Sequence, residues 1–135
     1  ECPQAITASR SFLVRVDARD AVNNTLSPEV GAPLSVTLEG MGRASGVVLR
    51  SKEFSRFEAS LYATIAATYK VHVHLSSVPL EGSPVLVQVS PAGVYAPSCS
   101  MHGSGLHDTF IDEPVGVTVE GRDQYGNSVD LTGVP

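Results

Sequence analysis

The residues of this chain best suited to chemistry are its histidines, and two of them stand close together. His72 and His74 alternate with apolar residues, so in a strand both imidazoles would project from the same face. Two imidazoles could begin a zinc site, but a structural zinc site takes four ligands and no nearby residue in the sequence supplies the others. The pattern therefore favours a polar, solvent-facing side of a strand, and neither a metal site nor a cofactor is predicted.

A second group of reactive residue types follows later in the chain. His102, His107 and Asp108 stand near three serines, Ser98, Ser100 and Ser104. A serine nucleophile needs a positioned base and oxyanion donors. The sequence contains neither a nucleophile elbow nor the strand-to-helix turn that carries one. We interpret this group as part of a connecting segment, and we predict no catalytic residue and no enzyme activity.

Three further residues would matter only if the chain passes through the secretory pathway. Asn23 opens Asn23-Asn24-Thr25, which fits the N-glycosylation sequon at a predicted turn. Cys2 and Cys99 could form a disulfide in an oxidising compartment, whereas in the cytosol two thiols are equally natural. Their spacing matches no metal or redox motif. A glycan at Asn23 and a Cys2–Cys99 disulfide are therefore conditional expectations.

Composition narrows the class of protein. The 135 residues include 9 Lys plus Arg against 14 Asp plus Glu, a formal net charge of −5. Nucleic acid is not predicted as a partner, because its phosphates require a basic surface. No apolar run approaches the roughly 20 residues needed to cross a bilayer, so direct membrane insertion is not predicted either. The chain opens on Glu1-Cys2-Pro3 without an initiator Met or a signal-peptide pattern, and we expect it to be part of a longer protein.

The elements that must position these residues show alternation at period two, which is typical of half-buried strands. The segment 57–67 is rich in alanine and resembles a helix at first sight, but Phe57, Ala59 and Leu61 keep period two. No capped stretch with a period of 3.6 residues appears anywhere. Many short strands separated by polar turns predict an all-β sandwich. The alternating segments are 12–17, 34–39, 57–67, 69–75 and 85–89.

One motif occurs twice, 103 positions apart, which is close to the length of one immunoglobulin-like domain of about 100 residues. Its copies are Val14-Arg15-Val16-Asp17-Ala18-Arg19-Asp20 and Val117-Thr118-Val119-Glu120-Gly121-Arg122-Asp123. We therefore expect a complete module at residues 1–92. Residues 93–135 would then hold a linker and the opening strands of a following, incomplete module.

These motifs resemble the filamin (actin-binding-protein-280) repeat family. The second copy carries Gly103-Ser104-Gly105-Leu106 and Arg122-Asp123-Gln124-Tyr125-Gly126-Asn127, and the first carries Gly82-Ser83-Pro84-Val85. The resemblance implies an immunoglobulin-like β-sandwich. Departures from the family pattern mark a distant member: Asn23 stands where glycine is usual, Ser104 replaces a proline and Val85 replaces a phenylalanine.

The second copy of the motif also makes physical sense as a turn that ends a strand. Gly126 would supply a positive φ, and Asp123 or Asn127 would bond nearby backbone. In the first copy Asn23 takes the place of that glycine, and Asn tolerates the left-handed conformation better than most residues.

The resemblance also implies a candidate binding site. In filamin repeats the third and fourth strands form a groove where partner peptides add a strand, and here those strands fall at 34–39 and 46–50. Such β-augmentation needs an edge with unpaired N–H and C=O groups. The alternative is an ordinary edge strand covered by a neighbouring module. The groove residues would be Leu34, Ser35, Val36, Thr37, Leu38, Val47, Val48 and Leu49.

Three functions remain open at this point. The leading one is a structural and protein-interaction module of an elongated tandem-repeat scaffold, cytoplasmic and either cytoskeletal, as in actin crosslinkers, or axonemal, as in motor accessory domains. The second is an extracellular adhesion or recognition module of a cell-surface or gamete-surface protein. The third is a hydrolase or metal-dependent enzyme, which would require a stoichiometric metal held by His72 and His74. Other proteins are the expected partners.

Overall fold

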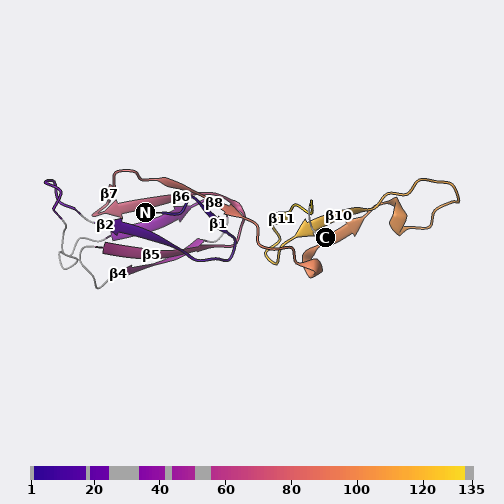
Figure 1. Cartoon of the computed structure of the whole chain (residues 1–135), viewed down its shortest axis with the longest axis horizontal. Coiled ribbons are helices and arrows are strands. Elements are labelled where there is room, and N and C mark those ends of the chain that lie inside the picture. Colours follow the sequence, from indigo (N-terminus) through magenta and orange to yellow (C-terminus); the bar gives the residue numbers. More distant parts are fainter. Residues whose placement is uncertain (1, 18, 25–33, 42–43, 51–55, 133–135) are drawn as a thin grey trace. The chain divides into compact units, whose positions relative to one another are not determined.

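The computed structural model describes residues 2–17, 19–24, 34–41, 44–50 and 56–132, and for residues 44–50 it describes the main chain only. The described residues form strands and two short 3-10 helices, with no α-helix among them. They divide into two compact units, Glu1–Ser90 and Pro91–Pro135. Each unit is described separately below (Figure 1).

The first unit is a β-sandwich of two sheets (Figure 1). In one sheet the strand order is β1-β8-β6-β3, with β7 beside β6, and in the other it is β2-β5-β4. All pairs are antiparallel except β1 with β8. The strands are β1 (Ala5–Thr7), β2 (Phe12–Asp17), β3 (Leu34–Glu39), β4 (Ala44–Arg50), β5 (Arg56–Ala63), β6 (Ala67–Leu75), β7 (Val78–Pro79) and β8 (Val85–Ser90).

The predicted all-β immunoglobulin-like fold is confirmed, and so is the strand interpretation of the alanine-rich segment. β5 spans Arg56–Ala63 and pairs with β2 on one side and β4 on the other. Ala59 and Ala63 of β5 are at most 2 % exposed, and Ala59 belongs to the packed core. The predicted third and fourth strands are present as β3 and β4.

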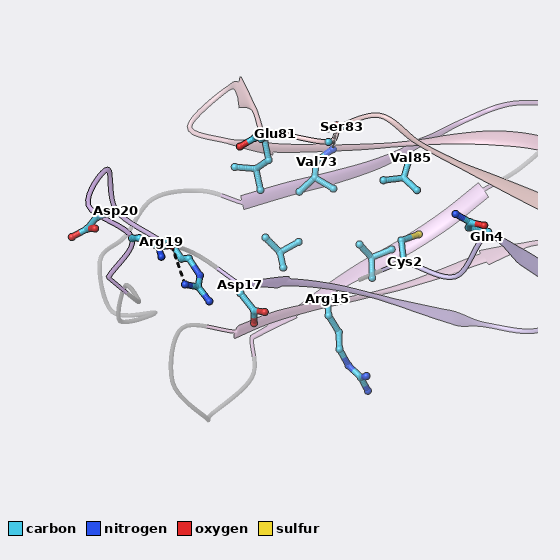
Figure 2. A pocket seen from close by; sticks show the side chains of 15 residues that line it. Cys2, Gln4, Arg15, Asp17, Arg19, Asp20, Val73, Glu81, Ser83 and Val85 are labelled. Carbon is cyan, nitrogen blue, oxygen red and sulfur yellow. Dashed lines mark hydrogen bonds between the residues drawn. The ribbon is translucent and has the colours of Figure 1, made fainter.

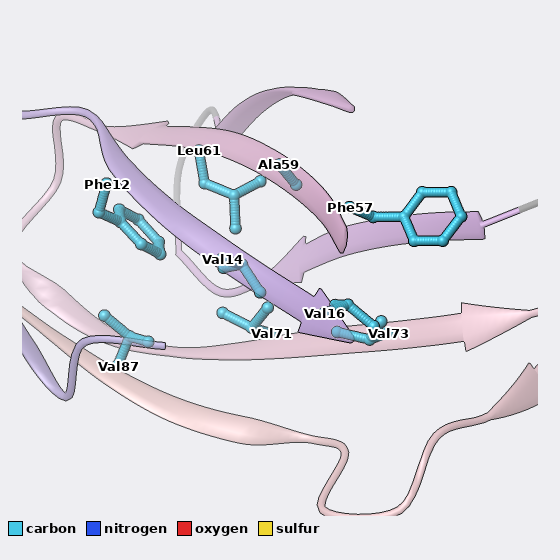
Figure 3. Packing of buried hydrophobic residues seen from close by; sticks show 9 residues of the cluster. All are labelled: Phe12, Val14, Val16, Phe57, Ala59, Leu61, Val71, Val73 and Val87. Atoms are coloured by element: carbon cyan, nitrogen blue, oxygen red, sulfur yellow. The ribbon is translucent and has the colours of Figure 1, made fainter. Parts of the chain in front are cut away.

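The core of the first unit comes from the inward-facing residues of β2, β5, β6 and β8 (Figure 3). Val14, Val71 and Val87 are at most 3 % exposed. Outward-facing residues between them are polar or partly exposed, which is the alternation that the sequence predicted. The nine clustered residues are Phe12, Val14, Val16, Phe57, Ala59, Leu61, Val71, Val73 and Val87.

Tyr69 at the start of β6 closes one end of this core. Its ring is fully buried, and its hydroxyl contacts the carbonyl oxygens of Met41 and of Ile65, four residues upstream. This is the arrangement of a tyrosine corner in immunoglobulin-like sandwiches. The chain passes the ring at Gly40, where a Cβ atom would overlap the Tyr69 side chain. Burial raises the pKa of Tyr69, so its hydroxyl stays protonated.

The second unit contains three strands and two 3-10 helices. They are η1 (Ala96–Ser98), β9 (Ser100–His102), η2 (Ser104–Leu106), β10 (Thr118–Arg122) and β11 (Ser128–Val129). The strand order is β11-β10-β9, and both pairs are antiparallel. Val117 and Val119 are about half exposed, 49 % and 52 %, although their counterparts Val14 and Val16 lie in the core of the first unit. That this unit is the opening of a following repeat stays a prediction.

Candidate functional site

The predicted partner groove begins at β3, the last strand of its sheet. β6 pairs with one edge of β3, and β4 is likewise the last strand of the opposite sheet. Leu34, Val36 and Leu38 pack against the core but stay half-buried, unlike the fully buried inward residues of β2. An apolar, partly open edge with main-chain groups along it is what an added strand requires.

The other half of this candidate site rests on β4. Its main chain pairs with β5 over Ala44–Arg50, which places Val47, Val48 and Leu49 on the outermost strand of that sheet. Their side chains lie outside the described residues. The groove between the two edges therefore stays a prediction.

The outer face beside β3 is polar. His72 Nε2 lies 2.6 Å from Glu39 Oε2, and the His72 and His74 rings are stacked with centroids 6.2 Å apart. The two imidazoles thus share one face, as the sequence predicted. The hydrogen bond from His72 lowers the pKa of Glu39. Within the described parts of the chain, no group of three or more histidine, cysteine, aspartate or glutamate side chains could hold a metal ion.

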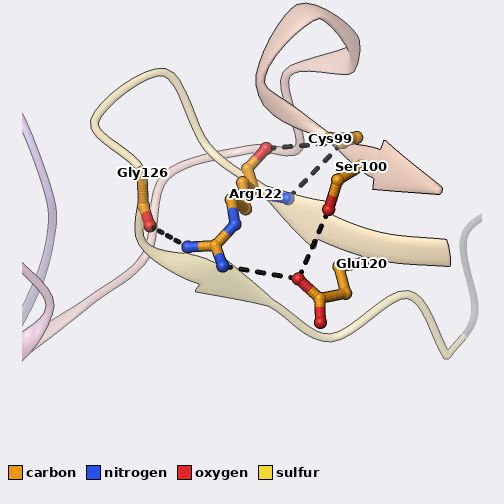
Figure 4. A network of polar contacts seen from close by, with 5 residues as sticks. All are labelled: Cys99, Ser100, Glu120, Arg122 and Gly126. Carbon is orange, nitrogen blue, oxygen red and sulfur yellow. Dashed lines mark hydrogen bonds and ion pairs between the residues drawn. The ribbon is translucent and has the colours of Figure 1, made fainter. Parts of the chain in front are cut away.

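The serines near His102, His107 and Asp108 have other partners in the second unit. Ser100 Oγ lies 3.3 Å from Glu120 Oε2, and Ser104 Oγ accepts a hydrogen bond from the Gly116 amide. Glu120 also contacts Arg122, so Ser100 belongs to a polar network on the outside of β10 (Figure 4). These contacts join strands and loops of the second unit, and the interpretation of this segment as a connection without catalytic residues stays a prediction.

The repeated Arg-Asp motif forms a hydrogen-bonded turn in the second unit. Asp123 Oδ1 accepts hydrogen bonds from the amides of Tyr125 and Asn127, each at 2.9 Å, and Oδ2 accepts one from Asn127 Nδ2 at 2.7 Å. Gly126 has a φ of +84°, as predicted. Arg122 closes the turn by donating to the Gly126 carbonyl (Figure 4).

The first unit repeats this turn in full. Asp20 Oδ1 accepts from the amides of Val22 and Asn24 at 3.0 and 2.8 Å, and Oδ2 accepts from Asn24 Nδ2 at 3.0 Å. Asn23 has a φ of +69°, which confirms that it replaces glycine in the left-handed conformation. Arg19 donates to the Asn23 side-chain carbonyl instead of a main-chain one. These bonds lower the pKa of Asp20, and those from Asn24 contribute most.

One contact distinguishes the two turns, and sequence reasoning missed it. Asp123 Oδ2 also accepts a hydrogen bond from the Ala92 amide at 2.9 Å, and the Asp123 side chain is fully buried. Burial alone would raise the pKa of Asp123. The hydrogen bonds from Asn127, Ala92 and Tyr125 outweigh that effect, and they hold the pKa below its usual value. No sequence signal points to Ala92, which is 31 positions away.

The predicted glycan at Asn23 and the predicted Cys2–Cys99 disulfide still depend on whether the chain is secreted. Asn23 is exposed, but Thr25 of its sequon lies outside the described residues. Both cysteines are free thiols in this structure and belong to different compact units, so their pairing stays a prediction. Burial raises the pKa of the Cys2 thiol. Cys99 Sγ instead accepts a hydrogen bond from the Arg122 amide (Figure 4).

Comparison with solved structures identifies the fold. The Lin-41 filamin domain matches with a TM-score of 0.55 and 16 % identity, over 64 % of this chain and 83 % of that one. Invasin, described as a bacterial integrin-binding protein, matches with a TM-score of 0.71 and 18 % identity, over 96 % of this chain and 26 % of its own. The Escherichia coli adhesin FdeC matches with a TM-score of 0.66 and 19 % identity, over 91 % and 39 %.

These similarities define a class of fold: the chain is built like a distant filamin-type, immunoglobulin-like repeat. It spans 26–39 % of the length of the two adhesin chains. No protein-family model matches the sequence, and no curated protein matches it. None of the helices in the described part of the chain is long and apolar enough to cross a membrane.

Proposed function

We propose that this chain is a non-catalytic structural and protein-interaction module within an array of tandem repeats. The observation that carries this proposal is the duplicated turn. Two aspartates 103 positions apart, Asp20 and Asp123, accept the same three hydrogen bonds from residues at the same spacing. A turn that recurs in two successive units is typical of chains built from repeats of one supersecondary structure. The adhesin and filamin neighbours support a role in interaction over one in catalysis.

The array would bind partners by strand addition at β3. An extended peptide paired with the outer edge of β3 would place alternate side chains over Leu34, Val36 and Leu38, which are half-buried and thus open to further apolar contact. Main-chain hydrogen bonds would supply affinity, and the apolar side chains would supply register. The partner would therefore be another protein with a segment of alternating apolar residues.

A peptide library can test this edge directly. We would select extended dodecapeptides that bind the chain and map each binder by amide chemical shifts and inter-strand nuclear Overhauser effects. Strand addition predicts contacts to the β3 main chain and loss of binding in Val36→Glu. The matched control is Leu86→Glu, which changes an exposed apolar residue on the outer face of β8 in the same sheet. Binders that map to other surfaces, or equal binding by both variants, would reject the groove.

Two versions of this proposal differ in the cellular compartment in which the chain acts. A cytoskeletal or axonemal scaffold is one, and an extracellular adhesion module is the other. The second gains support from the adhesin structures, which cover more than nine tenths of this chain at higher TM-scores than the filamin domain does. A thiol count and glycan mass on protein from its native source would decide. Oxidised Cys2 and Cys99 with a glycan on Asn23 indicate the adhesion form, and free thiols without a glycan indicate the scaffold.

A further inference from the structure

The main chain is held by hydrogen bonds on both sides of the boundary between the two units. On the first side, the Ser90 carbonyl at the end of β8 accepts a hydrogen bond from the Ala8 amide at 2.8 Å. On the second side, the Ala92 amide donates to Asp123 Oδ2 at 2.9 Å. Each of these bonds lies within one unit. Pro91 is therefore the only residue between two main-chain groups that are held by different units.

A proline at this position leaves the main chain little freedom. Its ring fixes φ at about −65°, and peptide bonds are planar, so the main torsion that stays free between the two held groups is ψ of Pro91. In a flexible linker, by contrast, every residue contributes two soft torsions. The hydrogen bond from Ala92 to Asp123 thus determines how much of the linker is free to rotate.

The next attachment of the linker to the second unit comes at Tyr95, whose amide donates to a carbonyl oxygen of β10 at 2.8 Å. The two residues before it, Gly93 and Val94, are exposed. Their amides have no hydrogen-bond partner in the part of the chain that the structure describes. If the bond at Ala92 opened, the free linker would grow from residue 91 to residues 91–94, which adds about 10 Å of extended chain.

The first unit shows that the Arg-Asp turn forms without this additional hydrogen bond. Asp20 accepts three bonds from its own loop, and no other donor among the described residues is bonded to its carboxylate. Asp20 borders a cavity of about 630 Å³ beside β2. Figure 2 shows its carboxylate directed away from Val73 and Val85, which also line that cavity. The bond between Ala92 and Asp123 is therefore an addition to the turn, and what it holds is the linker.

We infer that Asp123 is a clamp for the linker, which holds residues 92–94 on the second unit and leaves Pro91 as the only free residue between the two units. This inference rests on the proposed tandem array, in which such a clamp limits how freely neighbouring units reorient, because a short linker permits fewer orientations than a long flexible one. Opening of the clamp would release a segment that contains Gly93, and glycine is the least restricted residue type.

Nitrogen-15 relaxation of the intact chain measures the clamp directly. In the unmodified chain the amides of Gly93 and Val94 should have the order parameters of a rigid backbone, about 0.85. Asp123→Asn keeps one oxygen for the turn amides and puts an NH2 group in place of the oxygen that binds Ala92. It should lower both order parameters below about 0.6. Residual dipolar couplings should then show weaker alignment of one unit relative to the other. The matched control Asp20→Asn should leave all these values unchanged.

A second variant removes only the donor of the hydrogen bond. Replacement of Ala92 by lactic acid turns its amide into an ester, which has no N–H, and leaves Asp123 and its turn intact. This ester chain should mobilise Gly93 and Val94 as Asp123→Asn does.

A third variant restricts the linker itself. Gly93→Ala is tolerated, because a Cβ atom there meets nothing within 4 Å and the residue does not have a positive φ. In the Asp123→Asn background it should restore part of the lost order, since alanine has less conformational freedom than glycine. In the unmodified chain, where the clamp already holds the linker, Gly93→Ala should change little.

Order parameters below about 0.6 for Gly93 and Val94 in the unmodified chain would overturn the inference, because the clamp would then not hold. So would full order in both Asp123→Asn and the ester chain. Loosening by Asp123→Asn with no change in the ester chain would assign the effect to the turn, and this too would overturn it. Peptide binding at β3 does not involve the linker, so its failure would reject the partner groove and leave this result intact.

Discussion

The Arg-Asp turns of the two units use the same hydrogen bonds in different surroundings. In both, the aspartate accepts two main-chain amides and one asparagine side chain, and the fourth residue of the turn has a positive φ. In the second unit the aspartate is also fully buried and holds the Ala92 amide. Local sequence therefore specifies the turn. A segment distant in the sequence determines how many hydrogen bonds the aspartate carboxylate accepts in total.

In the strands before the turns, the residue of the first unit is the more deeply buried one. Val14 is 3 % exposed and Val117 is 49 % exposed, although they occupy matching positions. β5 and the opposite sheet cover the first, while in the second unit β10 has only β9 and β11 beside it within the described residues. The same residue type is therefore buried in one unit and half exposed in the other.

The largest expected effect comes from this unequal burial. Val14→Ala should lower the free energy of unfolding of the first unit by about 3 kcal/mol, because it leaves a cavity in a packed core. Val117→Ala should cost the second unit less than about 1 kcal/mol, since a half-exposed side chain loses little contact. Urea unfolding with a probe in each unit measures both. Equal losses in the two units would contradict the burial difference.

For the turn aspartates, substitution in the second unit should cost more stability than substitution in the first. Asp123→Ala should destabilise the second unit by about 2 kcal/mol, because it leaves donors without an acceptor at a buried site. Asp20→Ala should have a smaller effect, since water can replace the carboxylate at a partly exposed turn. Hydrogen exchange of the Ala92 amide supplies the specific readout. It should accelerate in Asp123→Ala and stay unchanged in Asp20→Ala.

The pH dependence of stability provides a second test of the role of Asp123. The pKa of Asp123 in the folded chain lies below its value in the unfolded chain. Its contribution to stability is therefore complete above the unfolded value of about 3.9 and is lost as the pH falls through the lower folded value. Exchange of the Ala92 amide, corrected for its intrinsic pH dependence, should lose protection below about pH 4. Asp123→Asn should flatten this profile, and an unchanged profile in that variant would assign the titration to another group.

The smallest expected effects concern the left-handed position of each turn. Gly126→Ala should cost about 1 kcal/mol, because an alanine at a φ of +84° meets its own carbonyl. Asn23→Gly should change stability by no more than about 0.5 kcal/mol, since Asn tolerates this conformation and glycine only removes the bond from Arg19. Thermal unfolding of both variants measures these changes. A stabilised Gly126→Ala would contradict the turn geometry.

Much of the fold could be predicted because it depends on short-range patterns. Alternation at period two placed β2, β3, β5, β6 and β8, since successive side chains of a strand point to opposite faces. It also placed His72 and His74 on one polar face. The positive φ at Gly126 and Asn23 followed from residue type, because few other residues adopt it without strain.

The candidate sites could be predicted only in part. Alternation placed Leu34, Val36 and Leu38 on one face of a strand. That β3 lies at the edge of its sheet followed only from a family resemblance, since the order of strands depends on pairing between distant segments. The cavity beside β2 could not be predicted from the sequence, because it is lined by residues of β2, β6 and β8 and of three segments outside the strands.

The sequence by itself determined five strands of the first unit, the repeated turn and the spacing of 103 residues, because each depends on neighbouring residues or on a direct comparison of two segments. The tertiary structure alone decided that Asp123 holds Ala92, that Val14 is buried while Val117 is exposed, and that β2 and β3 are edge strands. The reason is that burial and edge position are properties of what packs beside a residue, and those neighbours are distant in the chain.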